Sequence, residues 1–201
     1  MKLLLTILAG ALLAACGGNL ATVGPVRYDF GSLSGGSAGS RLPVAAVEVQ
    51  AVPALNGPAI HYRLAYAEPL RRLTYAESRW AAPPAELLQA VLERRFFVFP
   101  EADASGNGCR LELVIDEFEQ RFDDPRQGMA ILEARAALTP MHRGEILSRK
   151  SFVIRKPAPT PDARGGVAGA RDAVHALADD LDGWLADLSR AQPALVKRCR
   201  S

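Results

Sequence analysis

The stretch from Cys109 to Phe122, CRLELVIDEFEQRF, decides the architecture of the chain. Apolar and polar residues alternate in its first half, as in a half-buried strand, and one face carries Leu111, Leu113 and Ile115. The apolar phase then slips to Phe118 and Phe122, which predicts a bulge or bend. We therefore expect a long strand with one buried face.

Two further strands follow this stretch. Residues 128–139, GMAILEARAALT, and 145–156, EILSRKSFVIRK, are joined by the short polar segment PMHRG. A connection of this kind between two apolar runs is typical of a hairpin. The three stretches together predict an antiparallel meander.

Strands and a helix are also predicted ahead of the central stretch. Residues 44–52, VAAVEVQAV, and 59–66, AIHYRLAY, alternate like strands on either side of a turn, PALNGP. A helix is expected from Pro84 to Phe96, because Pro83 and Pro84 suit a first turn and Glu86 complements the helix dipole.

The last periodic segment runs from Val167 to Leu188, with apolar residues at steps of three and four. It predicts a long amphipathic helix, which packs on a sheet or forms a coiled-coil seam; its short length favours the sheet. The order β-β-α-β-β-β-α predicts a single α+β domain, with two helices on one face of a mostly antiparallel sheet.

The N-terminus, MKLLLTILAGALLAAC, has the basic start, apolar run and small-residue cleavage site of a secretory signal. The added Cys16 looks like a bacterial lipobox; a plain signal with a chance cysteine is the alternative. The apolar run is shorter than the roughly 20 residues of a membrane-spanning helix. Gly17, in place of Asp, resembles the sorting pattern for the periplasmic leaflet of the outer membrane rather than the inner membrane.

These features divide the chain into three parts. We expect a signal peptide at residues 1–15, a lipidated N-terminus with a Gly/Ser-rich linker at 16–43, and a folded domain at 44–201. The net charge of +2 is spread without a basic stripe, which argues against a nucleic-acid partner. In an oxidising compartment Cys109 and Cys199 are expected to form a disulfide, with two free thiols as the alternative.

The sequence offers no catalytic or metal-binding set. Three histidines, His61, His142 and His175, have no metal-ligand spacing, and the G-x-S-x-G match at residues 35–39 lacks the flanking strand and helix of a nucleophile elbow. The acidic residues of 116–124 alternate with phenylalanines and are expected to form a solvated strand face. The residues therefore favour a tethered binding or assembly module over an enzyme.

Several stretches together resemble the ABC-type transport auxiliary lipoproteins, the PqiC-like family. They are the lipobox, YDFG at 28–31, residues 47–96 and CRLELVIDEFEQRFDD at 109–124. The most specific parts are IHYR at 60–63, RWAAPP at 79–84 and DEFEQRFDD at 116–124.

The resemblance implies a non-enzymatic lipoprotein that works in the periplasm with an MCE-domain protein, an ABC permease and its ATPase. It implies no cofactor beyond the diacylglycerol and N-acyl chains on Cys16. Two alternatives stay open: an LptE-like lipoprotein that assists an outer-membrane protein, and a lipid-binding shuttle. The transported lipid and a homo-oligomeric state are also left open.

Partner contacts are expected on the sheet face that the helices leave uncovered. Arg63 and Arg135 are the candidates there, beside His61 and Glu133. Trp80 is expected to be a core anchor, with a role as an interface residue as the alternative.

Overall fold

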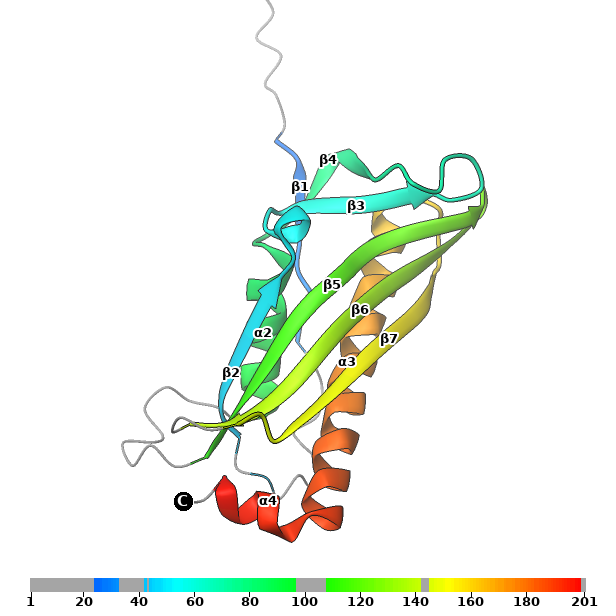
Figure 1. Cartoon of the computed structure of the whole chain (residues 1–201). Coiled ribbons are helices and arrows are strands. Elements are labelled where there is room, and N and C mark those ends of the chain that lie inside the picture. Colours follow the sequence, from blue (N-terminus) through cyan, green and yellow to red (C-terminus); the bar gives the residue numbers. More distant parts are fainter. Residues whose placement is uncertain (1–23, 33–41, 43, 97–107, 142–144, 200–201) are drawn as a thin grey trace, which may run out of the picture.

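Strand β5 (Cys109–Asp124) runs the length of the sheet and organises it. The computed structural model describes residues 24–32, 42, 44–96, 108–141 and 145–199. One edge of β5 pairs antiparallel with β6 (Gln127–Pro140), and the other edge pairs in parallel with two strands, β2 (Val44–Ala51) and β3 (Ala59–Leu64) (Figure 1). The register of β5 shifts between Ile115 and Glu117, where the apolar phase of the sequence slips.

Three more strands complete the sheet. Strand β7 (Ser148–Ala158) pairs antiparallel with β6, β4 (Leu73–Trp80) pairs antiparallel with β3, and β1 (Val26–Tyr28) pairs in parallel with β4. The seven strands form one mixed sheet, which confirms the predicted α+β class. Its longest pairings are the antiparallel ones of the predicted meander, β5 with β6 and β6 with β7.

The sequence analysis missed β1 and β4. In β4, LTYAESRW, charged and small residues interrupt the apolar alternation, and its burial follows no regular period of two. Strand β1 lies inside 16–43, the segment assigned to the N-terminus and linker, and Phe30 just after it is only 2% exposed. The folded part therefore begins ahead of residue 44, because this short segment adds to the sheet through β4.

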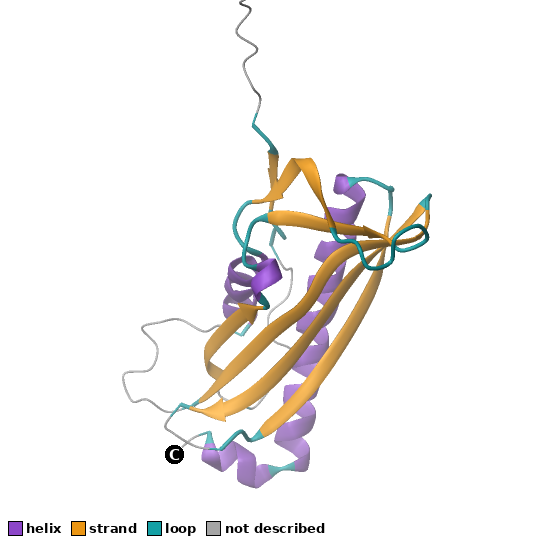
Figure 2. Cartoon of the chain, turned by 45° about the horizontal axis from the view of Figure 1, so that its top comes forward, coloured by secondary structure: helices purple, strands orange, loops and turns teal. Residues whose placement is uncertain are grey.

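Helices cover one face of the sheet (Figures 1 and 2). Helix α2 (Pro84–Arg95) packs behind β2, and α3 (Ala163–Ala191) lies across β6 and β7. Packing on the sheet, rather than a coiled-coil seam, thus accounts for the periodicity of α3. A short 3-10 turn (Pro53–Leu55) and a further helix that was not predicted, α4 (Pro193–Arg198), complete the described elements.

The core lies between the sheet and these helices. The inner side of α3 buries Val174, Leu177, Leu181 and Leu185 almost completely, against strand residues that include Leu113 and Leu132. Helices α2 and α3 are joined by Arg95, whose Nη2 lies 2.6 Å from Asp182 Oδ2. The helices leave the opposite face of the sheet uncovered (Figure 1).

A disulfide ties the C-terminal helix to the central strand. Cys109, the first residue of β5, is bonded to Cys199, which follows α4, and both residues are fully buried. This is the pairing that the sequence favoured over two free thiols.

The predicted lipidation site, Cys16, lies outside the described residues. Within the described part of the chain, no helix has the length and apolar character needed to cross a membrane.

Candidate partner-binding face

We define the open face as the side of β5, β6 and β7 that points away from α2 and α3 (Figure 1). It arises from strand alternation, because β6 buries every second residue, such as Ala134 and Ala136, toward the helices and turns the intervening residues to the other side. Arg135 is such a residue, and its neighbours across the strands are Val114 on β5 and Ser151 on β7.

Arg135 is exposed on the open face, as predicted, with 62% of its side chain accessible. It forms a two-pronged ion pair with Asp116: Nε donates to Oδ2 and Nη2 donates to Oδ1, both at 2.7 Å. Hydrogen bonding to this carboxylate raises the pKa of Arg135 above its usual value. The guanidinium is therefore held in a fixed, charged position on the surface.

An open hollow of about 490 Å³ lies beside Arg135. It has both apolar and charged walls, which include Val114, Ile146, Arg149 and Lys150. Ile146 is 40% exposed, although it is a large apolar residue. Glu112 also lines the hollow, which therefore combines apolar groups with charges of both signs. A surface of this kind is suited to contact with another molecule.

Arg63 does not fulfil the expectation of an exposed contact residue. Only 14% of its side chain is accessible, and Nε donates to Glu119 Oε1 at 2.7 Å. Its Nη2 also lies 3.6 Å from Glu117 Oε2, and its Nη1 donates to the carbonyl of Pro69. These contacts make Arg63 a structural residue that links β3 to β5.

Glu117 and Glu119 belong to the acidic stretch that was expected to be solvated, and this expectation is wrong for both. The side chain of Glu119 is 3% exposed and that of Glu117 is 22% exposed. Arg72, which the sequence analysis did not single out, pairs with both carboxylates. The parallel pairing of β3 with β5 brings Arg63 to the two carboxylates, and the pairing of β3 with β4 places Arg72 beside them. No local pattern in the sequence signals these pairings.

His61 lies on β3 near this cluster. Burial, followed by the nearby charge of Arg72, lowers the pKa of His61. The imidazole is therefore neutral at pH 7.

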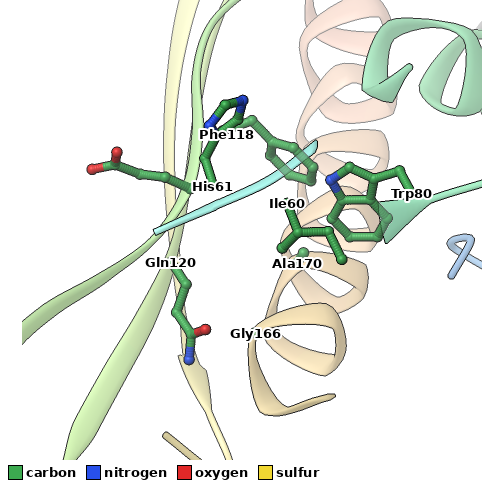
Figure 3. Close-up of a pocket in the computed structure, with 8 residues that line it drawn as sticks. Ile60, His61, Trp80, Phe118, Gln120, Gly166 and Ala170 are labelled. Carbon is green, nitrogen blue, oxygen red and sulfur yellow. The ribbon is translucent and has the colours of Figure 1, made fainter. Parts of the chain in front are cut away.

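Trp80 lies in the core rather than at a surface. It is 3% exposed and packs against Phe30 and Phe118, with ring centroids 5.0 and 5.5 Å away. Figure 3 shows it beside a small hollow that is also lined by His61 and Gln120. This hollow holds about 10 Å³, room for no more than a water molecule. Of the two roles considered for Trp80, core anchor and interface residue, its burial supports the core anchor.

Gln120 is a buried polar residue that sequence reasoning did not identify. It is 3% exposed, and its Oε1 accepts a hydrogen bond of 2.7 Å from the Tyr75 hydroxyl. Burial raises the pKa of Tyr75, so this phenol stays protonated as the donor. The contact joins β4 to β5 beside the start of α3.

Among the residues that the structure describes, no cluster of three or more His, Cys, Asp or Glu side chains is arranged to hold a metal ion. Two of the three histidines lie in this part of the chain, on β3 and α3, while His142 lies outside it.

Comparison with known proteins gives the family. The sequence model of the ABC-type transport auxiliary lipoprotein component matches residues 33–182, which is more than half of the chain. The chain therefore belongs to this family, as the resemblance indicated. It is an auxiliary lipoprotein component of ABC-type transport, associated with the cell envelope through a membrane anchor. A search of curated proteins found no match.

Two solved structures share the fold. The crystal structure of protein XCC0632 from Xanthomonas campestris has a TM-score of 0.69 and 16% identity, over 84% of this chain and 99% of that protein. A second crystal structure, of an uncharacterised protein, has a TM-score of 0.60 and 14% identity, over 81% and 99% of the two chains. At these identities the likeness concerns the fold alone.

Proposed function

We propose that this lipoprotein is the auxiliary component of an MCE-type system that moves lipids between the two membranes, and that it acts by docking on partner proteins. Its family membership supports the transport role. The observation that supports docking on a partner is the open face, which the helices leave uncovered. It presents the Arg135 guanidinium, held by Asp116, and a hollow with apolar and charged walls. Catalysis has no part in this role.

Cys16 is the residue that attaches the protein to the membrane in this proposal. Diacylglycerol and an N-acyl chain on its thiol and amine would give the multiple insertion signals that stable membrane attachment needs. Gly17 favours the outer membrane, with the domain in the periplasm. Seven residues lie between Cys16 and Gly24, so the eight Cα–Cα steps from one to the other can span at most about 28 Å. The domain would thus stay close to the leaflet.

The partners in this proposal are the MCE-domain protein, the ABC permease and its ATPase. Of these, the MCE-domain protein is the one expected to contact the open face, since it occupies the same compartment. The hollow beside Trp80 is far too small for an acyl chain, so it does not serve as the interior pocket of a lipid shuttle.

Affinity capture tests the proposal. The tagged full-length lipoprotein is purified in mild detergent and the proteins that accompany it are identified. We expect the MCE-domain protein and the ABC components to co-purify with it. In a separate measurement, mass spectrometry of the Cys16→Ser variant should show that its N-terminus is no longer lipidated. Capture of an outer-membrane barrel protein alone would support the LptE-like alternative, and co-purified lipid without protein would support the shuttle.

A further inference from the structure

Strand β7 forms one end of the sheet and has an unpaired edge. Its eleven residues pair with β6 on one side, and no described strand pairs with the other side (Figure 1). An edge of this length presents a row of backbone donors and acceptors that can accept an added strand.

The side chains of β7 are strongly basic. Arg149, Lys150, Arg155 and Lys156 lie on this one strand, and none of them forms an ion pair with another described residue. Arg149 and Arg155 are exposed and belong to the open face, since they alternate with the buried Phe152 and Ile154. Lys150 and Lys156 share the phase of Phe152 and Ile154, and Lys150 Nζ lies 5.1 Å from the centroid of the Phe152 ring. The open face of β7 therefore receives the charges of Arg149 and Arg155, neither of which pairs with a described carboxylate.

Apolar surface accompanies this charge. Val153 lies between the two arginines on the open face and is 56% exposed. Ile146, just ahead of β7, lines the open hollow together with Arg149. An added strand would therefore find an apolar contact at its centre and cations on either side.

We infer that β7 accepts an extended acidic segment of the partner protein as an additional strand. The inference rests on the proposed function, in which a partner docks on the open face. Opposite charges on neighbouring strands stabilise their pairing, whereas like charges oppose it. The basic side chains thus disfavour pairing of β7 with β7 of a second copy. Pro157 has no backbone N–H, so it shortens the part of the edge that can donate hydrogen bonds to an added strand.

The test uses the full-length lipoprotein in detergent and a synthetic peptide of alternating Glu and Val, with hydrogen–deuterium exchange and calorimetry as readouts. We expect the peptide to slow amide exchange in Ser148–Ala158, and we expect its affinity to fall as salt rises. The double variant Arg149→Glu/Arg155→Glu should bind about tenfold more weakly. The matched control is Arg171→Glu, an exposed position on α3, which should bind like wild type.

Two further probes separate strand addition from simple charge attraction. A Lys/Val peptide should not bind, and the Glu/Val peptide with every amide N-methylated should not protect β7, because it cannot donate hydrogen bonds to the edge. Equal binding of the methylated peptide would overturn the inference. Protection of β7 by phosphatidylglycerol vesicles but not by the peptide would also overturn it, and would assign the cations to lipid headgroups.

The same preparations distinguish this inference from the proposed function. If the lipoprotein binds the MCE-domain protein while the peptide leaves β7 unprotected, only the strand addition fails. If the peptide protects β7 while the MCE-domain protein does not bind, the inference holds and the proposed function fails.

Discussion

The charges near β3 and β5 divide into two kinds, although the side chains are of the same types. Arg63, Arg72, Glu117 and Glu119 are largely withdrawn from water and neutralise one another. Arg135 and Asp116 form an ion pair at the surface. A buried ion pair is costly to break, because the remaining charge loses its partner without regaining water. The first group therefore maintains the fold, and the second is free to take part in binding.

Arg63→Glu should destabilise the domain strongly, because it places a third carboxylate beside Glu117 and Glu119. We expect a loss of about 3 kcal/mol or more in the free energy of unfolding, measured by urea denaturation. The matched variant Arg135→Glu should leave the free energy of unfolding close to the wild-type value, because exposed ion pairs contribute little. Equal effects of the two variants would contradict the distinction between buried and surface charges.

At the scale of elements, strong periodicity made β5, β6, β7, α2 and α3 predictable from the sequence. Each has an apolar face that is buried against the other layer, and in β5 this face continues after a phase slip at the register shift between Ile115 and Glu117. Strand β4 was missed because charged and small residues interrupt its apolar alternation.

Of the two arginines expected on the uncovered sheet face, one was placed correctly, and the regularity of the local sequence pattern again explains the difference. Arg135 was placed correctly because it lies within a strand that alternates clearly. Arg63 was misplaced because its burial depends on the parallel register of β3 with β5, which joins segments more than fifty residues apart in the chain. Local patterns predict which face a residue occupies, but not what lies opposite it.

The start of α3 depends on a capping residue, Asp162, whose Oδ1 accepts a hydrogen bond of 2.8 Å from the Gly165 amide. This bond lowers the pKa of Asp162. Asp162→Ala should therefore cost about 1 kcal/mol at pH 7 in thermal or urea unfolding. Because the folded pKa is lowered, the ionised form contributes stability above the unfolded value of about 3.9, and this contribution is lost as the pH falls through the folded pKa. If the loss of unfolding free energy in Asp162→Ala stayed constant down to pH 2, the negative charge of Asp162 would have no role in the cap.

Two glycines of α3 form a matched pair. A Cβ at Gly165 would lie 2.0 Å from the Thr160 carbonyl oxygen, whereas a Cβ at Gly183 would meet nothing within 4 Å. Gly165→Ala should destabilise the domain by about 1–3 kcal/mol, since backbone must move. Gly183→Ala should stabilise it by about 0.5–1 kcal/mol, since alanine favours the helix. Unfolding free energies of the two variants test this packing, and the opposite order would contradict it.

For the whole molecule, the disulfide stabilises the fold, whereas the open face is the proposed partner surface. The bond from Cys109 to Cys199 closes a loop with a sequence separation of 90 residues, and it holds α4 against the end of the sheet. The open face lies on the other side of the core from α3, so a partner can bind there without disturbing the packing of the helices.

The double variant Cys109→Ala/Cys199→Ala should lower the free energy of unfolding by up to about 4–5 kcal/mol, the chain-entropy value for a loop of this length. The variant avoids leaving one buried thiol unpaired. Denaturation of wild type with and without reductant provides the control, and the reduced protein should match the variant. Stability that is the same in all three samples would contradict the structural role of the bond.

The central claim is that the open face docks on the MCE-domain partner, and site-specific photo-cross-linking tests it most directly. A photoreactive amino acid is placed at Val153 on β7 of the full-length lipoprotein, and, as a control, at Arg171 on α3; both positions are exposed. After irradiation in cells, we predict a cross-link from position 153 to the MCE-domain protein and none from position 171. Cross-links from position 171 alone, or none to that protein from either position, would contradict the account.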